Sequence, residues 1–470
     1  MEEKYIAAID LGSAFITLTV AKILGEDIQI LYHKKKASKG IRNSAVFNPM
    51  LASGPIKDII EDAEKELSIK ILQVVVGLPR CDIHLENATA TVERANPDES
   101  ITREEVECLK AVAQDTYPNL DPNKETIYGA IAQSFSDDEQ FQMIENDIIG
   151  VISKKFDGNF KLFIGKSSYI KTLDKLFKDL GIDIAKKYFT PITQAKAVLT
   201  SDEISNGVAL LDIGGGTTSV TIYQNNILRY YYSIPFGGKV ITSDIQTESF
   251  ISEKLSENLK LAFGACIPDK LQTLGEKIIQ IEGDDFEGFK QIPVKYLSEV
   301  ISARVRELTE AMMYAIQQSG LADKLRAGLV ITGGTANLAN IALYIKDLSG
   351  YNVRIGFPRK KFSAAGCPGV YEPEASTSVG LLLAAKEDSL SSCLEKAPEP
   401  DYDDEDDTEP ENDTLFTDKV VAATEQKVAK KKEKKVKKPK ENKPGIIQIT
   451  WDKLTGFVDR MQEDMNDQNV

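Results

Sequence analysis

From its start to about residue 386, the chain alternates between short apolar runs and longer amphipathic segments. Short apolar runs predict buried strands, and apolar residues that recur every three or four positions predict helices. The predicted strands are Tyr5–Asp10, Phe15–Ala21, Leu72–Val76, Ile83–Val92, Thr126–Gln133, Phe160–Gly165, Gly207–Ile213, Ser219–Tyr223 and Gly328–Thr332. The predicted helices are Pro55–Leu67, one opening at Thr102, Ser168–Leu180, Ser249–Phe263, Leu297–Ser319, Asn337–Leu348 and Thr377–Ala385. This alternation predicts an α/β fold.

The composition changes sharply beyond residue 388. Glu399–Asp413 holds ten acidic residues and Lys427–Lys443 holds ten lysines, and neither block has many apolar residues. Such a segment cannot bury enough apolar surface to offset the entropy lost on ordering. We therefore expect a disordered, acidic-then-basic linker over residues 387–445.

The last segment, residues 446–470, is amphipathic. Its apolar residues recur at spacings of four and three, which puts them on one helical face: Ile447, Trp451, Leu454, Val458, Met461 and Met465. The predicted helix is too short and too charged to span a bilayer, but it can lie in a membrane interface while the lysine run attracts anionic lipid. The same spacing also suits a helix that docks on a partner or pairs as a coiled coil.

The overall composition narrows the function classes. The chain has 470 residues, which is long enough for two or more domains, and a net charge of −15, which argues against general nucleic-acid binding. The five cysteines are scattered and odd in number, as expected of reduced thiols in the cytosol. No signal peptide and no apolar stretch of spanning length is present, so we expect a cytoplasmic protein.

Two turns between apolar strands carry candidate phosphate-binding residues. In the first turn these are Asp10, Gly12 and Ser13, although the turn alone is equally an ordinary hairpin. In the second turn they are Asp212, Gly214, Gly215, Gly216, Thr217 and Thr218. Three successive glycines make sense where backbone N–H groups must approach an anion closely. Asp10 and Asp212 each end a strand and could hold the waters of a Mg²⁺ ion.

A third turn, made of Gly333, Gly334 and Thr335, follows a buried strand and opens a helix. Such a turn can offer a helix N-terminus to an anion and a flat surface to a base, but alone it is also an ordinary strand–loop–helix connection. In this order and spacing, the three turns resemble the superfamily of actin, sugar kinases and heat-shock-chaperone ATPases.

That resemblance covers residues 1–386 and implies ATP or ADP, with Mg²⁺, held in a cleft between two similar domains. It also implies that the helix Ser249–Phe263 reaches the ribose and adenine. There Glu257 and Lys260 match the E-x-x-K spacing of relatives. A solvated ion pair one helical turn long explains the same spacing equally well.

Further segments resemble FtsA, the family of bacterial actin-like cell-division proteins. These segments are Pro235–Ile245, Glu257–Gly264, Val353–Pro358 and Ser376–Leu382. The resemblance implies an actin-like two-domain ATPase fold with an FtsA-type inserted α+β subdomain. The expected division is 1–81 (1A), 82–164 (1C, inserted), 165–206 (1A), 207–246 (2A), 247–325 (2B), 326–386 (2A and closing helix), 387–445 (linker) and 446–470 (amphipathic helix).

Membership of this family would imply a protein that forms actin-like filaments and tethers FtsZ, the tubulin homologue, to the cytoplasmic face of the inner membrane at the division site. Its partners would be the FtsZ C-terminal tail, further copies of itself, anionic lipids and later division proteins. The run containing Glu299 and Arg304 resembles the helix that receives the FtsZ tail. Arg304 is the candidate contact, with Arg306 and Lys295 nearby.

One position departs from the pattern of actin. Where actin carries a residue that orients the attacking water, the matching position before Pro191 is Thr190, and Gln194 is out of register. Threonine is too short and too weak a base for that role. We therefore expect slow or absent ATP hydrolysis.

Three alternatives share the superfamily fold. A small-molecule kinase needs a catalytic aspartate facing a substrate pocket, and the sequence offers none. A pilus-assembly-type binding module has the same inserted subdomain but no membrane helix of this kind. A chaperone needs a substrate-binding domain after the ATPase, and too few residues remain for one.

Overall fold

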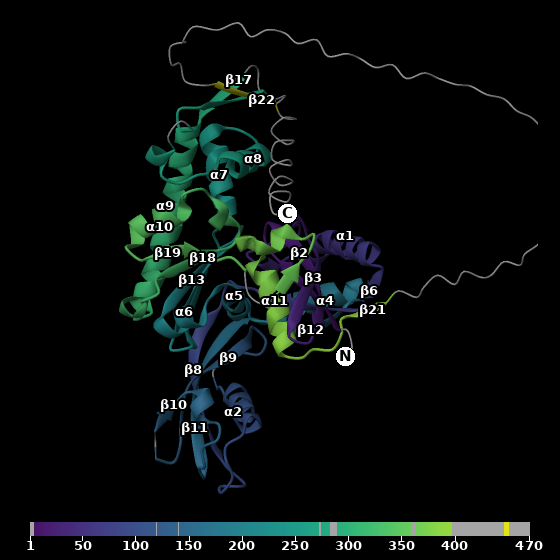
Figure 1. Cartoon of the computed structure of the whole chain (residues 1–470), viewed down its shortest axis with the longest axis vertical. Coiled ribbons are helices and arrows are strands. Elements are labelled where there is room, and N and C mark those ends of the chain that lie inside the picture. The colour runs from purple at the N-terminus through teal and green to yellow at the C-terminus, as the bar shows by residue number, and fades with distance from the viewer. Residues whose placement is uncertain are drawn as a thin grey trace, which may run out of the picture.

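The computed structural model describes residues 4–118, 120–139, 141–271, 274–282, 289–358, 362–396 and 446–450. In these ranges the chain forms two α/β units that meet at the centre, a separate sheet at one end and a helical lobe at the other (Figure 1). None of the helices described is long and apolar enough to cross a bilayer.

The first sheet is built around the N-terminal hairpin. Strand β1 (Lys4–Leu11) runs antiparallel to β2 (Phe15–Leu24), with Asp10 opposite Thr17. The strand order is β12-β7-β1-β2-β3-β20, which includes β3 (Asp27–Ala37), β7 (Gln73–Gly77), β12 (Asp183–Tyr188) and β20 (Phe362–Ala364). Strands β7 and β12 run parallel, so both end at the same edge as β1. Short pairs β4 (Ile41–Arg42) with β5 (Ala45–Val46), and β6 (Ile69–Ile71) with β21 (Leu394–Lys396), flank it.

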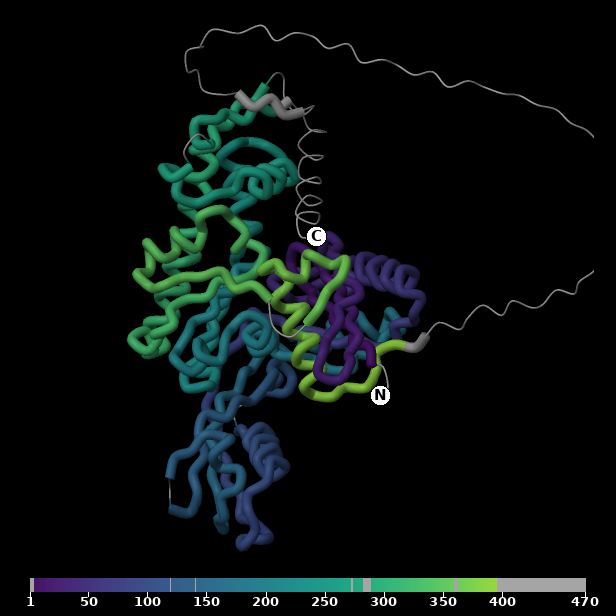
Figure 2. Tube along the Cα trace, viewed as in Figure 1, coloured from purple at the N-terminus to yellow at the C-terminus, as the bar shows by residue number. Residues whose placement is uncertain are grey.

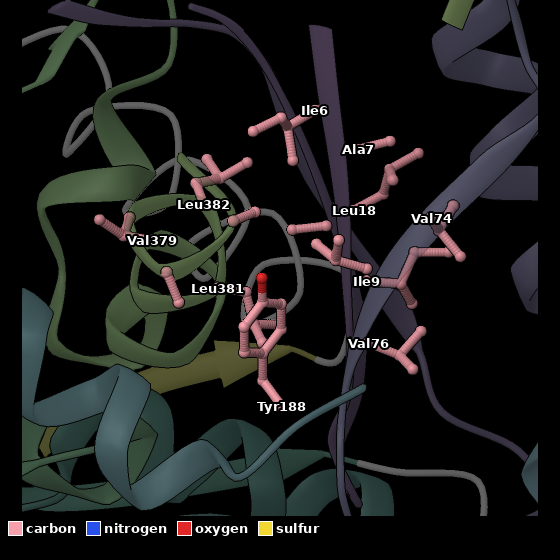
Figure 3. Packing of buried hydrophobic residues seen from close by; sticks show 14 of the residues in the cluster. Ile6, Ala7, Ile9, Leu18, Val74, Val76, Tyr188, Val379, Leu381 and Leu382 are labelled. Carbon is pink, nitrogen blue, oxygen red and sulfur yellow. The ribbon is translucent and has the colours of Figure 1, made fainter. Parts of the chain in front are cut away.

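Helix α11 (Ser376–Glu387) closes the core of this unit. Its Leu382 lies near Ile6 of β1, and the side chains of Val379, Leu382 and Ile6 are all buried (Figure 3). Helices α1 (Pro49–Leu67) and α4 (Ser167–Leu180) pack against each other and beside β3 and β12. Segments far apart in sequence, such as the first strands and residues 362–396, therefore lie side by side (Figure 2).

The second sheet repeats the first. Its order is β19-β18-β13-β14-β15, built from β13 (Val208–Ile213), β14 (Thr218–Gln224), β15 (Ile227–Ile234), β18 (Leu329–Thr332) and β19 (Val353–Ile355). As in the first sheet, an antiparallel run of three strands continues into two parallel strands. Helices α5 (Thr190–Val198), α6 (Ser201–Asn206) and α10 (Ile341–Ser349) accompany it, with a short 3₁₀ turn at Gly334–Asn337. The second α/β unit thus presents its own hairpin turn.

Residues 84–166 form a sheet of their own at one end of the molecule (Figure 1). Its order is β10-β9-β11-β8, made of β8 (His84–Glu93), β9 (Glu125–Ser136), β10 (Gln142–Met143) and β11 (Lys155–Lys166), with α2 (Arg103–Asp115) and α3 (Glu145–Ile148). Phe135 and Phe160 meet edge to face in its separate core. The helix predicted to open at Thr102 is confirmed: Thr102 and Glu105 exchange side-chain and backbone hydrogen bonds in a capping box at the start of α2.

The helical lobe contains α7 (Gly238–Ser249), α8 (Glu253–Phe263), α9 (Val294–Gln318), β16 (Ile278–Glu282) and β17 (Phe289–Pro293). The helix predicted over Ser249–Phe263 begins later than expected. Phe250 adopts a left-handed backbone after α7, and the Ser252 side chain accepts the Leu255 N–H to start α8 afresh.

Two boundaries at the end of the chain differ from the prediction. Residues 387–396, predicted to belong to the linker, are instead part of the fold: Cys393 bonds through its backbone to Tyr5 and Leu72, and β21 pairs with β6. The helix predicted over 446–470 does not start as a helix: Ile446–Thr450 is strand β22, parallel to β16. Ile447 is therefore in a strand, which agrees with the strand preference of the β-branched residues around it. The other predicted helix positions, 451–470, and linker residues 397–445 lie outside the described residues.

Candidate nucleotide site

A cavity of about 540 Å³ lies where the two hairpin turns face each other. Its volume is within the range of small-molecule sites. The lining includes predicted residues from all three glycine turns and from α8: Asp10, Gly12, Ser13, Asp212, Gly214, Gly215, Gly216, Thr217, Glu257, Lys260, Gly333, Gly334 and Thr335. Thr218 is not part of the lining; its hydroxyl instead donates to the Phe236 carbonyl at 2.8 Å.

The two hairpin turns are in contact. A Cβ added to Gly216 would lie 2.5 Å from Ser13 Oγ, and one added to Gly215 would lie 2.7 Å from the Ala14 Cβ. The space between the turns therefore has no room for larger residues. This close approach explains the glycines on the second turn in physical terms.

The second turn is held by backbone bonds from its own unit. The N–H groups of Gly238 and Lys239 donate to the carbonyls of Gly214 and Gly215, each at 2.8 Å. The Thr335 hydroxyl donates to the Gly214 carbonyl at 3.2 Å. These three bonds fix the backbone of the turn at Gly214 and Gly215.

The third turn, at Gly333, contacts the carboxylate of Asp212. Gly333 has a φ of +87°, and a Cβ there would lie 2.4 Å from Asp212 Oδ1. Only glycine combines this backbone conformation with such a close approach.

Glu257 and Lys260, both on α8, form a hydrogen-bond network at the cavity wall. Lys260 Nζ donates to Glu257 Oε2 and to Thr242 Oγ1, both at 2.8 Å, and to the Gly238 carbonyl at 3.0 Å. Its side chain is 11% exposed, so the pair is not a freely solvated one. Thr242, which the sequence did not indicate, joins α7 to this wall.

Arg80 is the residue that sequence reasoning missed. Its guanidinium lies between the two aspartates: Nη1 donates to Asp212 Oδ2, and Nη2 donates to Asp10 Oδ1 at 3.2 Å. Nη2 also donates to Thr377 Oγ1 at 2.8 Å. It follows Pro79 in no recognisable motif, so nothing in the sequence marked it.

The buried charges around Arg80 shift the pKa values of Asp10 and of Arg80 itself. Burial raises the pKa of Asp10, as does the nearby Asp212, while the charge of Arg80 opposes the shift. Burial would lower the pKa of Arg80, but Asp212 and Asp10 hold it above its ordinary value. His33, on the cavity wall, has its pKa lowered to about 4 by burial and by Lys35.

The position matched to the water-orienting residue of actin is not at the cavity. Thr190 is buried and packs its methyl group against Gly77. Gln194 instead donates to Asp212 Oδ2 and to Thr377 Oγ1, each at 2.9 Å. It is also buried, and neither residue lines the cavity.

The carboxylates of Asp10 and Asp212 could hold a Mg²⁺ ion only if phosphate oxygens also contact it. Asp10 and Asp212 supply the carboxylate oxygens that Mg²⁺ prefers. Nowhere among the described residues do three or more His, Cys, Asp or Glu side chains gather in a way that could hold a metal. Phosphate oxygens and waters would therefore have to complete the shell of any ion here.

Arg304 lies on α9, away from the cavity. Its guanidinium makes two bonds to Asp244, at 2.7 and 2.8 Å, and one to Glu307. Nearby, Lys295 pairs with Asp269, and Arg306 reaches the Tyr344 hydroxyl. Of the predicted membrane-facing residues, only Ile447 lies within the described chain.

Comparison with known proteins agrees with this geometry. The family model "Cell division protein FtsA" matches residues 209–380. The FtsA of Neisseria meningitidis is 28% identical over 386 residues, covering 82% of this chain and 91% of that protein. The FtsA of Bacillus subtilis is 24% identical over 383 residues, covering 82% and 83%. These matches confirm the resemblance to the FtsA family.

Solved structures show the fold. A PilM–PilN type IV pilus biogenesis complex superposes with a TM-score of 0.57 at 13% identity, covering 81% of this chain and 98% of that one. MreB5 of Spiroplasma citri, solved bound to ADP, gives 0.50 at 13% identity, covering 82% and 97%. These likenesses show that the chain has the actin-like fold, as predicted.

Proposed function

We propose that this protein is an ATP-binding, actin-like cell-division protein that polymerises and tethers FtsZ to the cytoplasmic face of the inner membrane at the division site, where it recruits later division proteins. The observation that carries the proposal is the meeting of two hairpin turns from two similar units around one cavity, in a chain related to FtsA along most of its length.

The cavity is proposed to hold ATP or ADP. Backbone N–H groups of the second turn and the Ser13 hydroxyl would contact phosphates, while Lys260, Glu257 and the turn at Gly333 would surround the nucleoside. Mg²⁺, when bound with the phosphates, would neutralise their charge, with Asp10 and Asp212 orienting its waters.

We expect ATP to act as an assembly ligand, with slow turnover. The cavity lining includes no glutamine, and two of its carboxylates outside the turns, Glu257 and Glu374, are paired with lysines. Neither of these two paired carboxylates is suited to positioning an attacking water. A phosphate-release assay on purified protein should give less than about one turnover per second, and a faster rate would contradict this part of the proposal.

The FtsZ contact is proposed at Arg304. Because its guanidinium already pairs with Asp244, an incoming acidic peptide has to share or replace that partner. Arg304→Glu should weaken binding of the FtsZ C-terminal peptide by about tenfold or more in fluorescence anisotropy. Lys57→Glu, on the distant helix α1, serves as the charge-matched control and should bind as the parent does.

Membrane attachment is proposed for the tail. Trp451→Glu with Leu454→Glu should abolish sedimentation with anionic liposomes, since two charges would enter the apolar face. Lys453→Gln with Arg460→Gln changes the net charge equally but on the polar face, and should retain most binding. Equal loss in both variants would point to simple charge attraction.

Electron microscopy on lipid monolayers tests the whole proposal. With ATP, the full chain should form filaments on the lipid and recruit FtsZ. Binding to FtsZ without filaments or lipid attachment would favour a pilus-assembly-type cytoplasmic module instead.

A further inference from the structure

Arg80 is a buried cation of the cavity wall, where it lies between carboxylates from both α/β units. Asp10 is the last residue but one of β1 in the first unit, and Asp212 is the last but one of β13 in the second. The guanidinium contacts both, and only 8% of the Arg80 side chain is exposed. A single positive charge therefore connects the two hairpins.

The surroundings fix this side chain in position. The Arg80 carbonyl accepts bonds from the Tyr231 hydroxyl at 2.5 Å and the Ser233 hydroxyl at 2.8 Å, both on β15. Thr377 of α11 accepts from its guanidinium. Backbone and side chain are thus held by elements of both units, as expected of a built site rather than a surface ion pair.

A cation in this place changes what the aspartates can bind. Two adjacent carboxylates with no cation nearby would attract a divalent ion by themselves. With the guanidinium between them, most of that attraction is already satisfied, and a second cation would be repelled by the first. The guanidinium is also the side chain best suited to phosphate oxygens.

We propose that Arg80 is the resident cation of the cleft, so that nucleotide binds with little dependence on Mg²⁺ and no divalent ion binds before the nucleotide. This inference rests on the proposed nucleotide binding. It concerns which cation neutralises the phosphates and the two aspartates.

The first test compares ATP affinity in Mg²⁺ and in EDTA, by calorimetry on the full chain. For the parent, the two dissociation constants should differ by less than about tenfold. In Arg80→Gln the ratio should grow by about ten- to hundredfold, the range for losing a hydrogen bond to a charged group. Arg354→Gln removes an ion-paired arginine outside the cavity, where Arg354 bonds Glu203, and should leave the ratio unchanged.

The second test needs no nucleotide. Electron paramagnetic resonance of Mn²⁺ should show no bound ion in the parent and one bound ion in Arg80→Gln. If Arg80→Gln does not fold, as judged by thermal melting, Arg80→Lys replaces it in both tests. A lysine keeps the charge but cannot bridge both carboxylates as the planar guanidinium does. In Arg80→Lys the ratio of the ATP dissociation constants in EDTA and in Mg²⁺ should therefore rise by a smaller factor than in Arg80→Gln.

Two results would overturn the inference. One is a parent that loses more than about a hundredfold in ATP affinity without Mg²⁺. The other is a folded Arg80 variant with the parent's ratio and no bound Mn²⁺, which would make Arg80 a structural ion pair only. A parent that binds neither ATP nor ADP, with or without Mg²⁺, refutes the proposed function, and the Mn²⁺ result then still reports on Arg80.

Discussion

The two hairpin turns of the cavity occupy equivalent places in two similar sheets, yet they are built differently. The turn at Asp212 is held by backbone N–H groups and a hydroxyl from its own unit, and its carboxylate accepts from both Arg80 and Gln194. The turn at Asp10 has one glycine, and its carboxylate is more exposed, at 15% against 4%. The carboxylate of the Asp212 turn is thus the more enclosed of the two, and we expect the Asp212 turn to set the position of the phosphates.

The largest difference should appear when each carboxylate is neutralised. Asp212→Asn should lower the free energy of unfolding by about 3 kcal/mol, since it removes a buried charge from a hydrogen-bonded ion pair. Asp10→Asn should cost about 1 kcal/mol or less, because its carboxylate is the more exposed of the two and accepts one longer bond from Arg80, at 3.2 Å. Denaturant unfolding measures both, and equal losses would contradict the asymmetry between the turns.

Contact between the turns gives the next largest effect. Gly216→Ala should clash with Ser13 and cost about 2 kcal/mol, in the range for overpacking, with a matching loss of nucleotide affinity. Adding Ser13→Gly removes the clashing atoms and should restore part of the lost stability and part of the lost nucleotide affinity. Gly54→Ala on α1, where a Cβ meets nothing within 4 Å, is the matched control. A double variant no better than Gly216→Ala would mean that the turns do not press on each other.

The stability of the folded protein should depend on pH through His33, which lies in the first α/β unit. His33 bonds Thr19 Oγ1 at 2.8 Å, and its pKa of about 4 lies below that of an unfolded histidine. The unfolded chain therefore takes up the proton first. Stability from this group is complete above about pH 6.5 and is lost as the pH falls toward 4, by about 1–2 kcal/mol at pH 5. His33→Gln should flatten this part of the pH–stability curve, and an unchanged slope would exclude His33 as its source.

The smallest effect is expected at the support of the second turn. Thr335→Val removes the bond to the Gly214 carbonyl and should weaken nucleotide binding by about fivefold, the worth of one neutral hydrogen bond. Thr247→Val loses an exposed bond within α7 and should leave the affinity unchanged. Equal effects from both would show that the second turn does not depend on Thr335.

The sequence predicted the three glycine turns because their signals are local: glycines next to the ends of apolar runs are visible in short segments. Arg80 was not predicted, since its role arises from contacts with Asp212 and Thr377, far away along the chain. Gln194 was judged out of register for a related reason: only packing shows that Thr190 points at Gly77 while Gln194 reaches Asp212.

The end of the fold was predicted less well than its start. The change in composition suggested a linker from residue 387, but Leu390, Cys393 and Leu394 pack against the first unit. Ile446–Thr450 fits both a helical face and a strand by pattern, and the backbone pairing with β16 decides between them. Such choices depend on tertiary partners, which periodicity alone does not reveal.

Equilibrium binding of ATP to the purified full chain tests the central claim most directly. Calorimetry should give one ATP per chain, with a much weaker affinity in Gly216→Ala and the parent's affinity in Gly54→Ala. An absence of ATP and ADP binding in the parent, or equal binding in all three proteins, would contradict a nucleotide site between the two hairpin turns.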